Sequence, residues 1–156
     1  MKLSKEGYDL IAKFEGLSLK PYLCSAKVPT IGFGSTFYED GKKVTMLDKP
    51  ITKVRALDMF KVIADKFAKD VDKLVVSNVN QNQFDALVSF AYNVGSDIDT
   101  DTIAEGLGDS TLLKKVNKNP DDPSIRNEFL KWNKAGGKII TGLTRRRNEE
   151  ASIYFS

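Results

Sequence analysis

The feature that most constrains the fold is a long apolar pattern in the middle of the chain. Between positions 53 and 76, apolar residues recur three or four positions apart, at Leu57, Phe60, Ile63, Phe67, Val71 and Leu74. This is the spacing of one helical face, and Thr52 predicts the N-cap of that helix. A helix of this extent is roughly 36 Å long, which is long for a chain of 156 residues. We therefore expect either a helix that connects two lobes or a long core helix.

The rest of the chain predicts shorter helices and one small sheet near the N-terminus. Apolar runs at 19–23 and 30–33 and a turn at Asp40–Gly41 favour short strands between about residues 18 and 45. Capping residues, glycines and prolines predict helices at about residues 4–14, 80–95, 102–107, 110–119, 122–136 and 142–154. This order of elements predicts the α+β class.

The composition excludes several kinds of catalytic site. The chain has no histidine and one cysteine, which excludes Ser-His-Asp and Cys-His catalysis and an intramolecular disulfide. We expect no metal and no cofactor, because a structural zinc site needs more cysteine or histidine ligands. The net charge of +3 is compatible with an anionic partner such as a cell envelope.

The chain shows no signal for export or membrane insertion. Residues 1–8 contain no apolar segment of the kind found in signal peptides, and no run of about 20 apolar residues is present. We therefore expect a protein without a transmembrane segment, which stays in the cytoplasm where it is made.

The stretch from Phe14 to Thr36 carries the candidate chemistry. Glu15 is expected to end the first helix, because Gly16 after it can adopt the left-handed conformation. The partial negative charge at a helix C-terminus favours a protonated carboxylic acid, the form that a general acid needs. On composition alone, a glutamate at a helix end is most often a solvated surface residue. Gly32 and Gly34 leave room above the predicted sheet for a ligand or another backbone.

The spacing within this stretch closely resembles the active-site segment of the phage-type lysozymes, glycoside hydrolase family 24. In that family a glutamate is followed nine residues later, usually by aspartate, and six residues further by a threonine within the motif T-I-G-x-G. This chain has Glu15, Cys24 and Thr30 at those positions. Cys24 is the departure, although some members have cysteine there.

Two later segments extend the resemblance from about residue 6 to residue 150. The run 83–87, continuing to Asn93-Val94-Gly95, looks like the central helix of the family. The C-terminal segment is similar in Phe129-x-x-Trp132, Gly136-Gly137, Gly142-Leu143, Arg146-Arg147 and Glu150.

The resemblance implies a two-lobed lysozyme-like fold within a single domain spanning residues 1–156. A small antiparallel sheet lobe is expected at about 15–50, and a connecting helix at about 52–76. A helical lobe at about 77–156 is expected to pack with the N-terminal helix 4–14. We expect a monomer.

The implied activity is that of a muramidase, which hydrolyses the β-1,4 bond between N-acetylmuramic acid and N-acetylglucosamine in bacterial peptidoglycan. The family implies inversion, with Glu15 as general acid while Cys24 and Thr30 position or activate the water. Cys24 has four possible roles: it orients the water, acts as a base when ionised, attacks carbon directly, or is a small buried hydrophobe.

The resemblance also implies supporting residues. Thr36 and Tyr92 fall where family members line the sugar cleft; the alternative is ordinary packing. An arginine of the C-terminal segment, Arg146 or Arg147, is expected to approach Glu15, although a basic run of this kind is ordinarily a solvated helix face.

Delivery to the wall is expected to depend on a membrane-permeabilising partner, a holin. In this scheme the enzyme, an endolysin, stays in the host cytoplasm until release, acts in the periplasm and causes host cell lysis. Two other classes of protein are alternatives: a lysozyme-like module that binds peptidoglycan without cleaving it, and a helical nucleic-acid-binding protein. The interspersed acidic residues disfavour the second.

Overall fold

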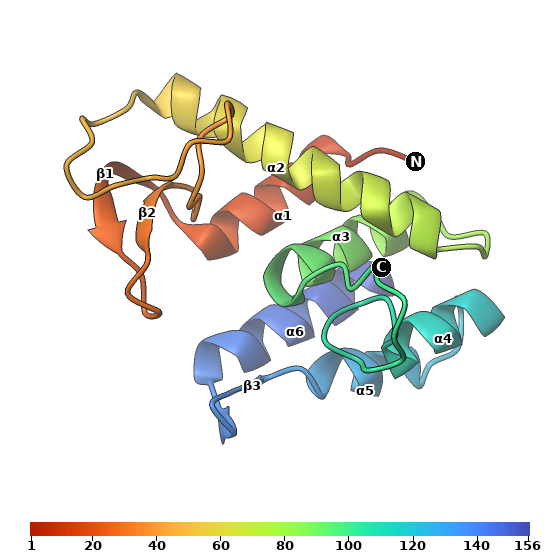
Figure 1. Ribbon diagram of the computed structural model, residues 1–156. Helices are drawn as coiled ribbons and strands as arrows, with labels where there is room; N and C mark the ends of the chain where they lie inside the picture. The colour runs from red at the N-terminus through yellow and green to blue at the C-terminus, as the bar shows by residue number, and fades with distance from the viewer. The chain divides into compact units, whose positions relative to one another are not determined.

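The computed structural model describes all 156 residues and contains six helices and two small antiparallel hairpins (Figure 1). The helices are α1 (Lys5–Glu15), α2 (Lys53–Leu74), α3 (Gln81–Val94), α4 (Thr111–Lys118), α5 (Ile125–Leu130) and α6 (Thr141–Tyr154). Strands β1 (Ser18–Leu23) and β2 (Pro29–Gly32) pair with each other, as do β3 (Lys134–Ala135) and β4 (Lys138–Ile139). The α+β class is confirmed. No helix is both long enough and apolar enough to span a membrane.

The chain divides into two compact units. We call residues 8–66 the sheet unit, and residues 1–7 with 67–156 the helical unit. The division passes through α1 and α2, so each of these helices contributes to both units. The predicted lobe boundaries stay predictions.

Helix starts were predicted well because side-chain caps are local in sequence. The hydroxyl of Ser4 accepts a hydrogen bond from the Gly7 N–H at 3.1 Å at the start of α1. Thr52 does the same for Arg55 at the start of α2, also at 3.1 Å. The capping box of α3 is complete, with Asn80 accepting from the N–H of the third helical residue and that residue's side chain accepting from Asn80.

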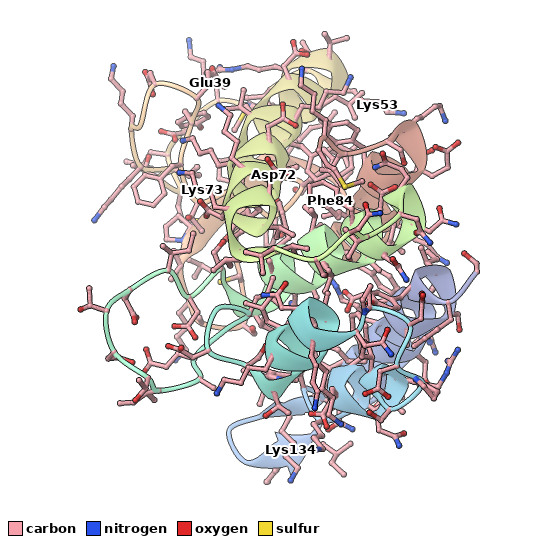
Figure 2. All side chains as sticks on the ribbon, turned by 90° about the vertical axis from the view of Figure 1, so that its right-hand side faces the viewer. Glu39, Lys53, Asp72, Lys73, Phe84 and Lys134 are labelled. Atoms are coloured by element: carbon pink, nitrogen blue, oxygen red, sulfur yellow. The ribbon has the colours of Figure 1, made fainter.

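The core of the helical unit surrounds α3. The sequence predicts one buried face, but every residue of this helix from Gln83 to Ala91 is buried, including Phe84, which is labelled in Figure 2. Phe90 contacts the rings of Phe129 and Trp132 edge-on, with centroids 5.6 and 5.5 Å apart. Such edge-to-face pairs add to the apolar burial that holds α5 and the segment after it against α3.

The sheet unit has a smaller core beneath the β1–β2 hairpin. Ile31 and Phe33 are buried, and the Phe33 ring lies 5.4 Å from that of Phe60 on α2. The predicted Asp40–Gly41 turn is present, with the Gly41 N–H donating to Tyr38 O at 3.0 Å. Its arms form only an isolated bridge, between Phe37 and Lys43.

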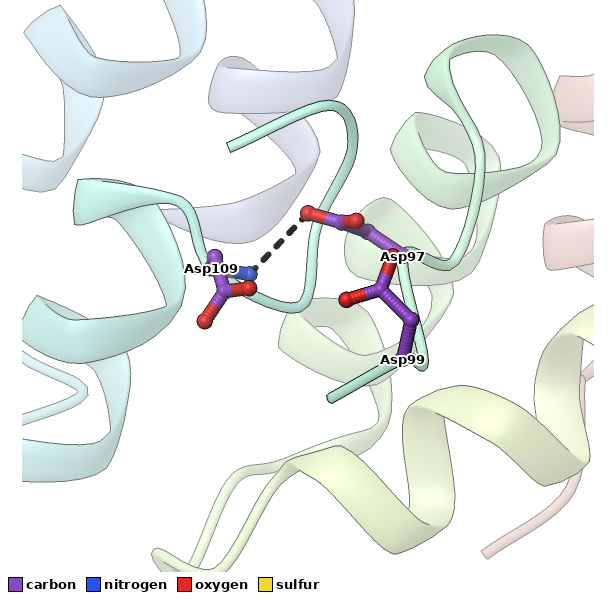
Figure 3. Close-up of side chains that lie close together, drawn as sticks. All are labelled: Asp97, Asp99 and Asp109. Carbon is purple, nitrogen blue, oxygen red and sulfur yellow. Dashed lines mark hydrogen bonds between the residues drawn. The ribbon is translucent and has the colours of Figure 1, made fainter. Parts of the chain in front are cut away.

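The helix predicted at residues 102–107 is wrong, because this segment is a loop organised by one carboxylate. Oδ2 of Asp97 accepts hydrogen bonds from the backbone N–H groups of Glu105, Gly106 and Asp109, at 3.1, 3.2 and 3.3 Å. Figure 3 shows the bond from Asp109. These bonds take backbone donors that a helix would otherwise use.

The helix predicted at 122–136 is shorter than expected at both ends. Asp122 accepts from the Ser124 N–H at 2.9 Å and forms a turn, so α5 begins only at Ile125. Gly136 and Gly137 do not end a helix but form the turn of the β3–β4 hairpin, with φ of 57° and 76°. Two successive positive φ angles are those of a type I′ hairpin turn. Figure 2 shows Lys134 on this hairpin.

Candidate active site

The candidate catalytic residues of the sheet unit lie on and beside the β1–β2 hairpin. Tyr22 of β1 is directly opposite Thr30 of β2, so their side chains share one face of the hairpin. Cys24 follows Tyr22 by two residues and continues that face just beyond the strand. The Cys24 N–H donates to Val28 O at 3.1 Å, which closes the turn between the strands.

Glu15 ends α1, as predicted, and its carboxylate lies against Gly34. Gly16 follows with φ of 65° and donates its N–H to Ala12 O at 3.2 Å. A Cβ placed on Gly34 would be 2.9 Å from Oε2 of Glu15. Gly34 also has φ of 80°, which side-chain-bearing residues rarely adopt. The space left by the missing side chain of Gly34 is therefore occupied by the Glu15 carboxylate. At Gly32 the corresponding space faces Ala56 of α2, whose Cβ would lie 3.6 Å from a Cβ placed on Gly32.

The Cys24 thiol is half-buried, and its surroundings favour the thiolate. Backbone N–H groups of Val28 and Ala26 stabilise the negative sulfur and hold the pKa of Cys24 below its ordinary value, against a smaller opposing effect of burial. The Thr30 hydroxyl adds to this stabilisation. A lowered thiol pKa is typical of reactive cysteines rather than of buried structural ones.

Thr30 lies next to this thiol and is only 3% exposed. Its hydroxyl donates to Val28 O at 2.9 Å and also stabilises the Cys24 thiolate. Because a hydroxyl has one proton, these two acceptors compete for it. The Thr30 hydroxyl therefore acts directly on the pKa of Cys24, which it lowers.

Tyr22 belongs to the same group of side chains, although the sequence analysis did not single it out. Burial raises the pKa of its phenol, and the negative charges of Cys24 and Glu15 raise it further. The three ionisable groups therefore interact electrostatically. Strand alternation would have identified Tyr22, since it is two residues from Cys24 and thus on the same face.

The two predicted substrate-binding residues lie in different units. Thr36 is half-buried in the sheet unit, where its carbonyl accepts from the Val44 N–H at 2.9 Å. Tyr92 is half-buried in the helical unit, with its ring 5.2 Å from that of Phe67. Their roles toward a sugar stay predictions.

Arg146 and Arg147 are not a solvated basic face, because they are 4% and 0% exposed. Glu150, also 0% exposed, accepts from Nε of Arg146 at 3.0 Å, from Arg147, and from the Ser89 hydroxyl at 2.8 Å. Burial lowers the pKa of Arg147, and the charge of Glu150 opposes this effect.

All three guanidinium nitrogens of Arg147 have partners inside the helical unit. Nε donates to Trp132 O at 2.9 Å, and the other two donate to Glu150 and Asn93. The support that the family resemblance assigns to an arginine beside Glu15 stays a prediction.

One group of carboxylates has the spacing of metal ligands. Oxygen atoms of Asp97, Asp99 and Asp109 lie within 4.8 Å of one another (Figure 3). Asp97 already accepts three backbone hydrogen bonds, so the loop itself accounts for its position.

Comparisons with known proteins agree with the motifs in the sequence. The family described as "Phage lysozyme" matches residues 12–150. An endolysin of Bacillus phage B103 is 39% identical across the whole chain, and one of Salmonella phage P22 is 34% identical over 97% of both proteins. The chain spans only about half of the Bacillus phage relatives, 55% in the B103 case.

The fold is also similar to solved structures. An endolysin from an Escherichia coli O157:H7 phage, FAHEc1, superposes with a TM-score of 0.86 at 37% identity, covering 100% of this chain and 94% of the other. A mutant of P22 lysozyme superposes with a TM-score of 0.81 at 31% identity, covering 100% and 99%.

Proposed function

Since this chain belongs to the phage lysozyme family, we propose that it is a muramidase that degrades peptidoglycan during host cell lysis. The bond cut is the β-1,4 linkage between N-acetylmuramic acid and N-acetylglucosamine. The observation that carries this proposal is the position of the Glu15 carboxylate against Gly34. The carboxylate is also near enough to Tyr22 of the adjacent hairpin for its negative charge to raise the pKa of that phenol. That hairpin face also carries Cys24 and Thr30.

In this mechanism Glu15 protonates the departing glycosidic oxygen, as one carboxylic acid of a glycosidase must. Its placement at the end of α1, against Gly34, supports the role. The close approach over Gly34 limits the rotamers of the side chain. Such a restriction lowers the entropy cost of positioning the proton.

Cys24 takes the role that aspartate has in many relatives. With its pKa lowered by backbone N–H groups, the thiol supplies a larger fraction of thiolate near neutral pH than a free cysteine would. The thiolate accepts a proton from water, which attacks the anomeric carbon and inverts it. Direct attack by sulfur is the alternative: it forms a thioglycoside that water then hydrolyses, and the configuration is retained. The anomer released first distinguishes these paths: α for inversion, β for the covalent route.

The central test is Glu15→Gln, assayed by loss of turbidity of Gram-negative cells with permeabilised outer membranes. We expect on the order of a hundredfold loss or more, the magnitude typical of general acid catalysis, with an unchanged circular dichroism spectrum. Glu6→Gln, in the exposed first turn of the same helix, is the matched control and should lyse normally. If the folded Glu15→Gln variant lyses cells at nearly the wild-type rate, Glu15 is not the general acid.

The replacement of aspartate by Cys24 keeps one other function open, that of a module that binds peptidoglycan without cleaving it. Wild-type protein would then sediment with purified cell wall but release no reducing ends. Sedimentation together with wild-type release of reducing ends that Glu15→Gln lacks would exclude this alternative.

We also propose that the enzyme reaches the wall through a separate membrane-permeabilising partner, a holin, and that it acts as a monomer. The family resemblance supports both statements. Expression alone should leave host cells intact, while co-expression with a holin should lyse them.

A further inference from the structure

The sheet unit presents an apolar turn to solvent, in the segment between β2 and α2. Its most prominent side chain is Leu47, which is 96% exposed, more than any other large apolar residue of the chain. Met46 before it is exposed too, as is Val54 in the first turn of α2. We call Met46 and Leu47 the apolar tip. Single exposed apolar residues are ordinary on protein surfaces, so what distinguishes this tip is how it is held and what surrounds it.

The apolar tip is held in place by a turn that one carboxylate organises. Asp48 accepts hydrogen bonds from the N–H and the hydroxyl of Thr45, at 2.9 and 2.6 Å, and from the Tyr38 hydroxyl at 2.7 Å. The Asp48 N–H donates back to Thr45 O at 3.2 Å, which closes the turn. On either side the chain is anchored in the core by Val44 and Ile51. Because the turn is already ordered, contact with a partner costs it little backbone entropy.

The same side chains join this turn to the start of α2. The guanidinium of Arg55 lies 4.9 Å from the centre of the Tyr38 ring, and Tyr38 in turn bonds to Asp48. Arg55 also forms an ion pair with Glu39 at 2.8 Å. Figure 2 shows Glu39 and Lys53 near this end of α2. The turn and the first residues of α2 are therefore neighbouring parts of one surface of the sheet unit.

Exposed lysines flank the apolar tip, and they have no acidic partners. Lys43, Lys49 and Lys53 are exposed and form no ion pair. The acidic residues of the segment are already bonded within it, namely Glu39, Asp40 and Asp48. The surface therefore combines a projecting apolar group with a surplus of positive charge. This combination is typical of proteins that bind the interface of an anionic membrane.

We propose that the apolar tip and its flanking lysines bind the surface of a membrane that contains anionic phospholipids. Met46 and Leu47 insert between the lipid headgroups, while the three lysines contact the phosphates. A soluble polyanion satisfies the lysines but leaves Leu47 in water, so the combination favours a lipid surface over nucleic acid or another anionic polymer. The inference goes beyond the muramidase function and does not rest on it, because no residue of the candidate active site takes part.

The test is sedimentation of the wild-type protein with vesicles of phosphatidylglycerol and phosphatidylcholine, at about 0.1 M salt. Vesicles of phosphatidylcholine alone are the comparison. Binding to the anionic vesicles should be saturable, and binding to the neutral ones should be on the order of tenfold weaker or less. Raising the salt concentration should weaken the binding, because salt screens the lysines.

Matched pairs of variants locate the contact. Leu47→Gln should weaken binding to the anionic vesicles by about tenfold, because it removes the inserted apolar side chain. Val76→Gln removes an exposed apolar side chain of the helical unit and should bind like wild type. Lys49→Ala should weaken binding by about fivefold, whereas Lys114→Ala, at an exposed position of α4, should leave it unchanged. All four positions are exposed, so folding is not at risk.

Three results would overturn the proposal: no binding to the anionic vesicles, equal binding by the two glutamine variants, or equal binding by the two lysine variants. Binding that depends on Lys49 but not on Leu47 would assign the surface to an anionic polymer, and this too would contradict it. The vesicles contain no peptidoglycan, so the result is separate from the lysis assay. A failure of the muramidase function would appear as wild-type protein that does not lyse cells, whether or not it binds vesicles.

Discussion

The sheet unit and the helical unit both gather ionisable side chains, but they hold them in opposite ways. In the sheet unit, Glu15 and Cys24 are half-buried, on and beside a hairpin of two short strands. In the helical unit, Arg147 and Glu150 are completely buried, and their partners come from α3, α6 and the segment after α5.

This difference separates a chemical role from a structural one. Charges removed from water must be paired, and removing one partner leaves the other unpaired at high cost. Half-exposed groups can still exchange protons with solvent and meet a ligand. Burial therefore points to a structural role for Arg147 and Glu150, and partial exposure is compatible with the reactive roles proposed for Glu15 and Cys24.

The largest effect is expected on removing the buried carboxylate of the helical unit. Glu150→Ala should lower the free energy of unfolding by about 3–5 kcal/mol, because it leaves two buried guanidinium groups without their anion. Thermal and urea unfolding measure this loss. Glu149→Ala, at the neighbouring and less buried position, is the control and should change stability far less. If both variants lose the same free energy of unfolding, the buried ion pairs of Glu150 do not have the structural role assigned to them.

A smaller effect, on activity rather than stability, is expected at Cys24. Cys24→Ala should lose on the order of tenfold or more in lysis rate and remain folded, since the site is half-buried. Cys24→Asp should retain substantial activity, because it supplies an ionised group at the same place. If Cys24→Ala lyses cells as fast as wild type, the thiol is only packing, and catalysis depends on Glu15 and Thr30.

Gly34 tests whether the close approach of Glu15 matters. A methyl group at Gly34 would press on the Glu15 carboxylate, so Gly34→Ala should reduce lysis by several-fold to tenfold. Gly41→Ala is the control, because Gly41 has a similar φ of 86° but nothing within 4 Å of the added carbon. Both variants should lose about 1 kcal/mol of stability to backbone strain. If the two variants lyse cells at the same rate, the close approach of Glu15 to Gly34 does not matter for catalysis.

The smallest expected effect is on the titration of the thiol. Its pKa is lowered in the folded protein, so alkylation by iodoacetamide should reach half its maximal rate at a pH below that of the denatured chain, about 8.5. The thiolate contributes stability above the unfolded pKa, and this contribution is lost as the pH falls through the folded pKa. Thr30→Val should shift the midpoint part of the way back, because the hydroxyl supplies only part of the stabilisation. Coincident midpoints for folded and denatured protein would contradict the assigned hydrogen bonds.

Features whose physical causes are local could be predicted from the amino-acid sequence. Helix starts at Ser4, Thr52 and Asn80 follow from side chains that bond to backbone groups three residues away. The end of α1 at Glu15 follows from the conformational freedom of Gly16. The spacing from Glu15 to Cys24 and Thr30 is equally local, and it indicates the family without any tertiary information.

The burial of ionisable groups and the contacts between them depend on how the helices pack, and the sequence did not predict them. Arg146 and Arg147 look like a solvated helix face until Ser89, Asn93 and Glu150 are seen around them. Two of these partners, Ser89 and Asn93, are more than 50 residues away along the chain. Local spacing carries no information on such contacts. Burial of a charge depends on distant partners that compensate its desolvation, and these become visible only when the helices are packed.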